Sequence, residues 1–259
     1  MGIRILIISD THGKHNLING SHFTAKNFPE ADIFIHAGDF ANTGRYSEEF
    51  ISFNNWLDHI PVIHSNRLLV AGNHDIHLDE THRQSNIKIA SKTKAMLTNG
   101  RYFQDESIVI DGIKFYLSPW TPEFYGWGFN AKRGDELAKI WEKIPEDVDV
   151  LVTHGPPYGI LDQIVKSGIQ GDSRFNEHLG CEELYKAVRK INPAVHIFGH
   201  IHGSRGYVTN GPLGMSTTFI NASFLDERYN PHPGPGYFLI ELTPSHLGTR
   251  KFDVKILES

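Results

Sequence analysis

Short apolar runs recur along the chain, and each ends at a glycine or a polar cluster. They are rich in Leu and β-branched residues and have the length of strands rather than of helices. Because their apolar residues are nearly continuous instead of alternating, we expect both faces of each strand to be buried. We predict five such strands, at residues 3–8, 33–35, 68–70, 148–152 and 195–198.

Segments with helical periodicity lie between these strands. Ser47 and Asp135 are the expected N-caps of the first and third helices, and Pro193 stops the last. We predict helices within residues 46–60, 80–97, 135–144 and 181–191. Strands that alternate with helices indicate βαβ units and a sheet with parallel strands.

The second half of the chain has a different pattern. Residues 107–119 alternate apolar and polar positions around Asp111-Gly112, which is typical of a tight hairpin. Further strand-like segments follow at residues 216–223, 236–242 and 251–257 without intervening helices. No linker or repeat divides the chain. We therefore predict an α/β fold with two sheets and outer helices, in one domain over residues 1–259.

Metal-binding residue types gather where the five strands end, and the chain holds 16 histidines. Taken alone, each cluster has an ordinary explanation as a turn or a cap, but five in succession favour a binding site. Ligands of open α/β sheets gather at the carboxyl ends of strands, so we expect five adjacent strands to surround one point. The clusters read SDTH at 9–12, HAGD at 36–39, GNHD at 72–75, THG at 153–155 and GHIH at 199–202.

Seven side chains in these clusters are candidate metal ligands. Two pairs are spaced two residues apart, so each pair points to one side of an extended segment. Seven nitrogen and oxygen ligands exceed one tetrahedral site and suit two transition-metal ions per chain, with Mn favoured and Fe or Zn as alternatives. A shared carboxylate bridges such ions at about 3.5–4 Å. The candidates are Asp10, His12, Asp39, Asn73, His154, His200 and His202.

In this order, the motifs resemble those of the calcineurin-like metallophosphoesterase superfamily, from about residue 3 to about residue 225. Segments 119–130, 153–162, 180–184 and 220–223 are similar to the branch of metallophosphoesterase domain-containing proteins and its bacterial relatives. The resemblance implies a four-layer αββα sandwich of two mixed β-sheets flanked by helices. It also implies a dinuclear metal site.

The resemblance further implies how the ligands divide between the ions. One ion takes Asp10, His12 and His202, the other takes Asn73, His154 and His200, and Asp39 bridges them. Some vertebrate members of the branch lack the first His of Gly-His-x-His, whereas this chain retains it as His200. The chain has GDFANTG where the protein phosphatases of the superfamily have Gly-Asp-x-x-Asp-Arg-Gly, which argues against that activity.

Two further residues of the third cluster are candidate catalytic groups. His74 follows Asn73 directly, so in an extended backbone its side chain points away from the ligand and toward the substrate phosphoryl group. Asp75 either orients His74 from behind or caps the following helix. The expected reaction is hydrolysis of a phosphate ester by attack of a metal-bound hydroxide on phosphorus. The family resemblance implies phosphodiesters, including cyclic nucleotides, as substrates. The aromatic segment 118–130 either lines the site or packs the loop.

Charge and cysteine content narrow the classes of partner and compartment. The formal net charge of −5 argues against a long nucleic acid held mainly through its phosphates, and it does not exclude the small phosphate ester that we expect as substrate. A nuclease, a phosphomonoesterase and a non-enzymatic metal-binding scaffold remain alternatives, and a homodimer is also open. We expect a cytoplasmic protein without membrane contact. The reasons are the single cysteine, the lack of a secretory or myristoylation signal and the lack of a long apolar stretch.

Overall fold

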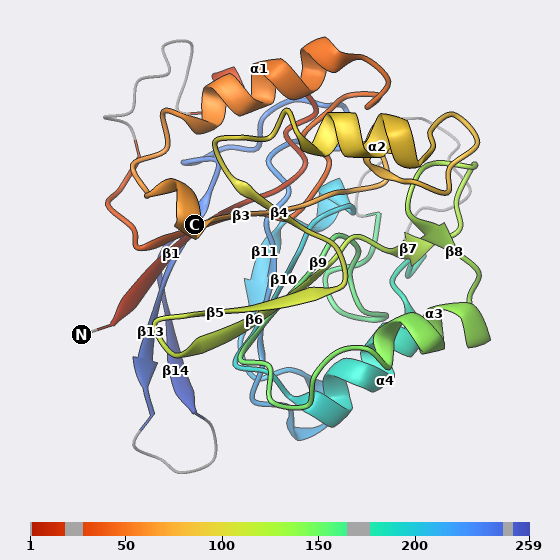
Figure 1. Cartoon of the computed structure of the whole chain (residues 1–259). Coiled ribbons are helices and arrows are strands. Elements are labelled where there is room, and N and C mark those ends of the chain that lie inside the picture. Colours follow the sequence, from red (N-terminus) through yellow and green to blue (C-terminus); the bar gives the residue numbers. More distant parts are fainter. Residues whose placement is uncertain (1, 19–27, 165–176, 246–250) are drawn as a thin grey trace.

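Two six-stranded sheets face each other in the computed structural model, which describes residues 2–18, 28–164, 177–245 and 251–259. Helices α1 (Ser47–Leu57) and α2 (Ile87–Lys94) lie on one side of the pair, and α3 (Asp135–Trp141) and α4 (Glu182–Ile191) on the other (Figure 1). The order helix, sheet, sheet, helix confirms the four-layer αββα sandwich of two mixed sheets.

The first sheet contains the three strands predicted in the first 70 residues, side by side and parallel. A fourth parallel strand extends it on one side, and two antiparallel strands from the end of the chain extend it on the other. In spatial order the strands are β14 (Phe252–Glu258), β13 (Phe238–Pro244), β1 (Ile3–Ile8), β2 (Ile33–His36), β3 (Arg67–Val70) and β4 (Arg101–Phe103).

The second sheet has four parallel strands, with an antiparallel strand at each edge. The predicted hairpin is confirmed, since β5 and β6 pair around Asp111-Gly112, which both have positive φ. In spatial order the strands are β11 (Gly206–Val208), β12 (Thr218–Asn221), β10 (Val195–Phe198), β9 (Val150–Thr153), β6 (Ile113–Ser118) and β5 (Glu106–Ile110).

Short elements join these layers. A two-stranded parallel pair lies in the aromatic segment, and within the described residues five turns of 3₁₀-helix connect the larger elements. They are β7 (Thr121–Pro122), β8 (Asn130–Ala131), η1 (His15–Leu17), η3 (His64–Asn66), η4 (Ile76–Leu78), η5 (His202–Ser204) and η6 (Pro212–Gly214).

Three of the predicted helix starts were wrong. Ser47 and Asp135 are the first helical residues and not caps; the preceding residues make no side-chain cap hydrogen bond either. Helix α2 is much shorter than the predicted 80–97, because Asn86 accepts hydrogen bonds from two backbone N–H groups and so begins the helix there. Helix α4 ends as expected before Pro193, at Asn192 in the left-handed conformation.

Apolar side chains fill three layers between these elements. The central layer joins the inner faces of the sheets, with residues such as Ile7 and Ile197 fully buried. A second layer packs the first sheet against α1 through Phe53 and Trp56, and a third packs the second sheet against α3 and α4 through Trp141 and Leu184. Strands covered on both faces explain the continuous apolar runs of the sequence.

The parallel strands of both sheets end at the same edge of the molecule. We expected the five predicted strand ends to come from five adjacent strands. Instead, three belong to the first sheet and two to the second. The backbone joins the sheets there, because Ser9 donates to Ala222 O (3.0 Å) and Phe224 donates to Ser9 O (2.8 Å).

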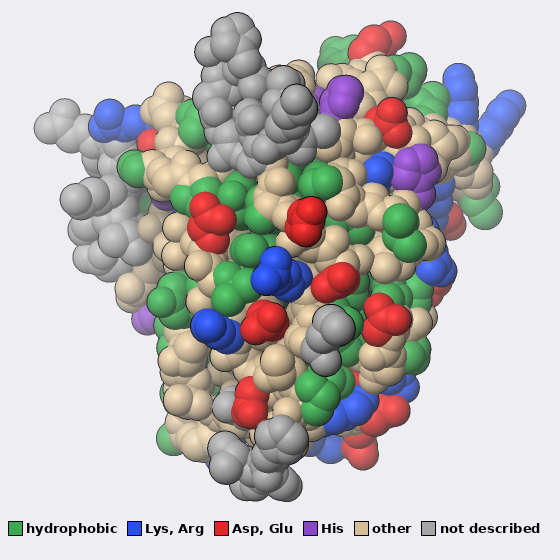
Figure 2. Space-filling model, turned by 90° about the vertical axis from the view of Figure 1, so that its left-hand side faces the viewer, with side chains coloured by type: hydrophobic (Ala, Val, Ile, Leu, Met, Phe, Trp, Pro, Cys, Tyr) green, Lys and Arg blue, Asp and Glu red, His purple; other side chains and the backbone are tan. Residues whose placement is uncertain are grey.

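Acidic and basic side chains are interspersed on the face beside β1, β13 and β14 (Figure 2). Among the described residues, no helix is both long and apolar enough to cross a membrane. The cytoplasmic location stays a prediction.

Candidate metal centre

The structure brings all seven predicted ligands together at the shared edge of the two sheets. Six of them, together with His74, form three overlapping groups of nitrogen and oxygen atoms, each compact enough to hold one cation, and Asn73 Oδ1 lies 3.0 Å from His154 Nε2. The groups are Asp10 with His12 and His202, Asp39 with His154 and His200, and His12 with Asp39 and His74. Because His12 and Asp39 each belong to two groups, the arrangement is one continuous site.

The first group joins β1 to the loop after β10. His202 Nε2 lies 3.4 Å from Asp10 Oδ1 and 3.2 Å from His12 Nε2. Two imidazole nitrogens at this distance share at most one proton, so at least one of them presents a lone pair to the other. Within the described part of the chain, the second nitrogen of His12 is buried without a hydrogen-bond partner. This donor chemistry fits a bound transition-metal ion.

The second group is centred on His154, which follows β9. Its Nε2 lies 3.0 Å from Asn73 Oδ1 and 3.4 Å from Asp39 Oδ2, and its ring centroid is 5.0 Å from that of His200. The same Asp39 oxygen lies 3.6 Å from His12 Nε2 in the first group. The Asp39 carboxylate is therefore placed between the two sets of imidazoles.

Hydrogen bonds from outside the groups fix the orientation of these side chains. His154 donates from Nδ1 to Ala37 O (2.9 Å), and His202 donates from Nδ1 to Asp226 O (3.1 Å), because a carbonyl oxygen only accepts. Ser223 Oγ donates to Asp10 Oδ2 (3.0 Å). Both imidazoles therefore present Nε2 to the centre, the arrangement by which neighbouring groups usually orient metal ligands.

The ligands sit on sharp turns and not on extended backbone, contrary to the expectation from their spacing. Asp10, His12, Asp39 and His200 all have positive φ, between 42° and 70°. Such values are uncommon outside glycine and often mark functional sites. Close packing also requires Gly199, since a Cβ there would overlap the carboxylate of Asp10.

Burial leaves two of the imidazoles uncharged. It lowers the pKa of both His12 and His200 to about 3, so each keeps a lone pair for a metal ion. Burial alone would also lower the pKa of His154, but the Asp39 carboxylate outweighs it and raises the pKa to about 9. A cation that replaces this proton would keep the charge of the site balanced.

The two carboxylates at the centre are held in their ionised form. Burial favours the neutral acid, but a hydrogen bond and the charge of His202 lower the pKa of Asp10 below its usual value. Burial likewise opposes ionisation of Asp39, and the charge of His154 lowers its pKa in spite of it. Ionised oxygens and neutral imidazoles together are the ligands that Mn, Fe and Zn bind.

His74 lies beside the first group and faces a cavity. Asn73 and His74 form a turn and not the extended segment that was expected. The backbone N–H of His74 donates to Asp39 Oδ1 (2.7 Å), and its Nδ1 donates to Asn42 O (2.6 Å). Its ring stacks on Trp127, with centroids 3.9 Å apart and planes 19° apart. The imidazole is therefore fixed on two sides.

Asp75 does not make either of the contacts expected of it. Its carboxylate accepts backbone hydrogen bonds from Gly72 (2.8 Å), Asp39 (2.9 Å) and Ala41 (2.9 Å), while Asn42 is the partner of His74. It also makes no side-chain cap of η4. The reason is that the loops after β2 and β3 leave three N–H groups unpaired, and Asp75 satisfies them and ties the loops together.

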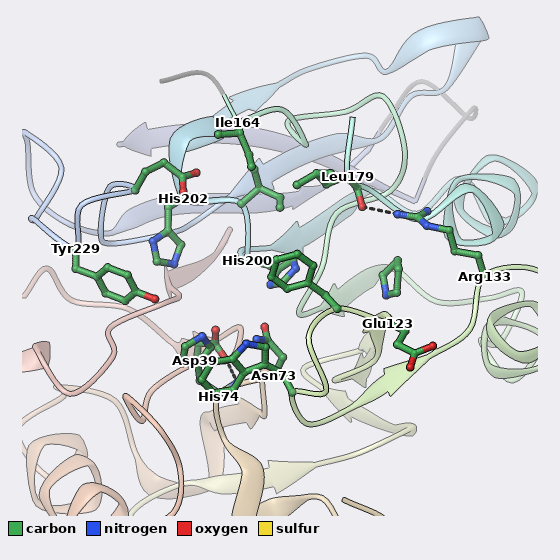
Figure 3. A pocket seen from close by; sticks show the side chains of 15 residues that line it. Asp39, Asn73, His74, Glu123, Arg133, Ile164, Leu179, His200, His202 and Tyr229 are labelled. Carbon is green, nitrogen blue, oxygen red and sulfur yellow. Dashed lines mark hydrogen bonds between the residues drawn. The ribbon is translucent and has the colours of Figure 1, made fainter. Parts of the chain in front are cut away.

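A cavity of about 270 Å³ opens beside the candidate ligands (Figure 3). One part of its wall is apolar, and Glu123 and Arg133 add charged groups opposite Tyr229 and His202. The residues that line it are Asp39, Asn73, His74, Pro122, Glu123, Phe124, Trp127, Arg133, Ile164, Leu179, His200, Ile201, His202, Glu227 and Tyr229.

The aromatic segment contributes to this cavity in part. Phe124 and Trp127 line it, whereas Phe129 is fully buried and Trp120 packs against the helices. Tyr125 is 81% exposed and lies outside the cavity wall. Both interpretations of the segment thus hold, each for different residues. Of residues 155–180, which follow His154, Ile164 and Leu179 line the cavity, and residues 165–176 lie outside the described part of the chain.

Sequence reasoning missed the loop that follows β12. This loop supplies Glu227 and Tyr229 to the cavity and the carbonyl of Asp226 to His202. A signal was present, because the polar residues DERYN follow a strand-like segment just as the other clusters do. The strand-like segment 216–223 belongs to the half of the chain without intervening helices, which is typical of antiparallel strands, although β12 pairs parallel to β10 and ends at the same edge.

Comparison with known proteins gives a consistent result. Residues 3–204 match the family model described as calcineurin-like phosphoesterase. The chain is 38% identical to human metallophosphoesterase domain-containing protein 1 over 244 residues. This alignment covers 88% of this chain and 68% of the relative. The chain is 40% identical to a UPF0046 protein of Caenorhabditis elegans over 228 residues. This alignment covers 85% of this chain and 69% of the relative.

The fold is similar to the crystal structure of a phosphopantetheinyl hydrolase from Mycobacterium tuberculosis. The TM-score is 0.53 at 18% sequence identity, over 87% of this chain and 90% of that chain. This likeness concerns the fold alone, whereas the family model and the relatives extend over most of the sequence, including the clusters of His and Asp. The chain belongs to the calcineurin-like phosphoesterase family.

Proposed function

We propose that the chain is a phosphodiesterase that uses two metal ions. The observation that carries the proposal is the position of Asp39, whose Oδ2 lies 3.6 Å from His12 Nε2 and 3.4 Å from His154 Nε2. A carboxylate between two sets of imidazoles is the arrangement by which proteins bridge two ions.

The ligands divide into two sets around this carboxylate. Asp10, His12 and His202 would hold one ion, and Asn73, His154 and His200 the other. The absence of sulfur and the mixture of imidazole with carboxylate and amide oxygen support Mn, Fe or Zn, with Mn our first choice. When bound, the two ions would supply a hydroxide for attack on phosphorus and neutralise charge on the phosphoryl oxygens.

His74 would act on the substrate from beside the metal ligands. Since Nδ1 donates to Asn42 O, Nε2 is free to accept a proton and then to donate it to the phosphoryl group or to the leaving oxygen. Asp75 would act indirectly, by holding the loop that carries His74 and the backbone of Asp39.

The cavity supports a diester as substrate, with cyclic nucleotides among the candidates. A phosphodiester carries a second organic group that a monoester lacks. Phe124, Trp127 and Leu179 provide an apolar wall beside the ligands on which such a group would pack. We further propose that residues 1–259 act as one metallophosphoesterase domain on a small phosphate ester.

A substrate panel combined with metal analysis tests the proposal. Purified protein reloaded with Mn²⁺ should hold two ions per chain, and chelation should abolish hydrolysis of bis-p-nitrophenyl phosphate. The ratio kcat/KM should be higher for diesters, including cyclic nucleotides, than for matched monoesters. Full turnover with one ion per chain would contradict the dinuclear site. Two bound ions without turnover of any ester would support the scaffold alternative instead.

A further inference from the structure

Tyr229 places an aromatic ring directly against two of the candidate metal ligands. Its ring centroid lies 4.9 Å from that of His12 and 5.4 Å from that of His202, with edge-to-face geometry in both cases. The residue lines the cavity, and its hydroxyl points into the space between His202 and His74 (Figure 3). The phenol therefore reaches the part of the cavity closest to the ligands.

The backbone around Tyr229 is held in an uncommon conformation. Its φ is 60°, in the left-handed region that bulky residues rarely adopt. Its N–H donates to Asp226 O (2.8 Å), and Lys14 Nζ donates to its carbonyl oxygen (2.6 Å). The Asp226 side chain also accepts from the backbone N–H groups of Arg228 and Asn230, at 2.8 Å each. These bonds fix the direction of the ring.

The same loop is attached to the segment that carries His202. Asp226 O accepts from His202 Nδ1 (3.1 Å), and Glu227 accepts from the backbone N–H of Gly203 (2.8 Å). His232 Nε2 donates to His202 O (2.9 Å). Any movement of Tyr229 relative to the ligands would break several of these bonds, so its position is coupled to theirs.

The hydroxyl of Tyr229 makes no hydrogen bond to any residue that the structure describes. Among the described tyrosines, Tyr237 donates to Glu258 (3.0 Å) and Tyr102 to Gln104 (3.2 Å), whereas the buried hydroxyl of Tyr116 also lacks a partner. Half-buried phenols usually find a partner. A hydroxyl fixed over the ligands, without a partner in the described part of the chain, is available for one supplied by a ligand.

His74 and Tyr229 contact the same imidazole from different positions. The His12 ring centroid is 4.6 Å from that of His74 and 4.9 Å from that of Tyr229. A phosphoryl group bound to the ions would lie within reach of both side chains. The organic groups of an ester would instead extend toward the apolar wall formed by Phe124 and Leu179.

On the basis of the proposed phosphodiesterase function, we propose that Tyr229 is a further catalytic residue, whose hydroxyl donates a hydrogen bond to a non-bridging oxygen of the bound phosphate ester. The bond stabilises negative charge on that oxygen as the transition state forms. No covalent bond to Tyr229 forms or breaks, and its proton stays on the phenol.

The variant Tyr229→Phe tests this role, because it keeps the ring and removes only the hydroxyl. In the Mn²⁺-loaded full chain, we expect two ions per chain as in the wild type. We expect kcat/KM for bis-p-nitrophenyl phosphate to fall about 10- to 100-fold, as for loss of a hydrogen bond to a charged group. Inhibition by inorganic phosphate should weaken about tenfold for the same reason. The exposed Tyr125→Phe is the matched control and should leave all three quantities unchanged.

Three results would overturn the assignment. Loss of a metal ion in Tyr229→Phe would show that the phenol is a ligand. Unchanged kcat/KM and phosphate inhibition would show that it does not contact the substrate. A rate loss that disappears for diesters with good leaving groups would place the hydroxyl on the leaving oxygen.

Failure of the proposed function has a different signature. In that case the wild type itself would hydrolyse none of the esters. The role of Tyr229 would then be judged by calorimetric titration of inorganic phosphate into the Mn²⁺-loaded wild type and Tyr229→Phe. Equal affinity in this titration would refute the inference independently of turnover.

Discussion

Replacing His74 with Ala removes a side chain that is held by two contacts. The change deletes the 2.6 Å hydrogen bond to Asn42 O and the 3.9 Å stack on Trp127. A hydrogen bond contributes about 0.5–1.5 kcal/mol and an aromatic pair a similar amount, so the free energy of unfolding should fall by about 1–3 kcal/mol. The hydrogen bond to Asp39 survives, because the backbone N–H of residue 74 donates it.

The rate should be affected more than the stability. Loss of one preorganised donor to the transition state costs about 10²–10³ in kcat, or roughly 3–4 kcal/mol. Since Asp39 keeps its backbone donor, both metal ions should remain bound in His74→Ala. If His74 is the general acid, the loss should shrink for esters with very good leaving groups. If it only stabilises charge on phosphorus, the loss should persist.

The assay measures metal content, urea unfolding and diester hydrolysis on one preparation of His74→Ala. His77→Ala is the matched control, since His77 lies outside the cavity wall, and its kcat should equal that of the wild type. The alternative role for His74 is that of a metal ligand, because His12, Asp39 and His74 together form a group that could hold a cation. Loss of an ion in His74→Ala would refute its assignment to the substrate.

Two further substitutions distinguish a metal ligand from a residue that orients one, and a change of pH tests the stability of the fold. His200→Ala should lose metal together with rate, measured by metal analysis and kcat; full occupancy would remove His200 from the ligand set. Ser223→Ala deletes the 3.0 Å hydrogen bond to Asp10 and should weaken metal affinity about 10- to 100-fold in a chelator competition, with unchanged affinity counting against an orienting role. Burial lowers the pKa of His15 to about 4 and of His196 to about 3, whereas both titrate near 6.5 when unfolded, so the unfolded chain binds more protons below that pH. Stability in urea should therefore fall by up to about 2 kcal/mol per histidine from pH 7 to pH 5, and an equal free energy of unfolding at both would contradict their burial as neutral groups.

The candidate ligands were predictable because the sequence pairs strand-like runs with metal-binding residues at one end. A parallel sheet brings such ends together whatever its exact strand order, so Asp10, Asp39 and Asn73 met as expected. The distribution of strands between two sheets was not predictable from periodicity, because β1 and β10 have equally apolar sequences. Strand pairing depends on contacts between distant residues that no local pattern records.

Local geometry was less predictable than the ligand set itself. The spacing of Asp10 and His12 suggested extended backbone, yet both have positive φ. The pair still converges, since His202 Nε2 lies 3.4 Å from Asp10 Oδ1 and 3.2 Å from His12 Nε2. Asp75 was also assigned incorrectly, since its partners are backbone N–H groups of two different loops. Every residue except proline has a backbone N–H group, so the sequence does not show which of them a side chain will bind.

The candidate metal centre depends on the whole fold, because a β-bridge between Ser9 and Ser223 joins the two sheets beside it. His12 and His202 are 190 residues apart in sequence and meet only after both sheets have formed and packed. Neither half of the chain alone contains a complete set for either proposed ion. Metal binding would therefore select the fully assembled chain over partly folded ones, and would stabilise it in proportion to the logarithm of the free metal concentration. Metal content would thus report on folding as well as on activity, so a variant that lost metal through a defect far from the site would resemble one that had lost a ligand.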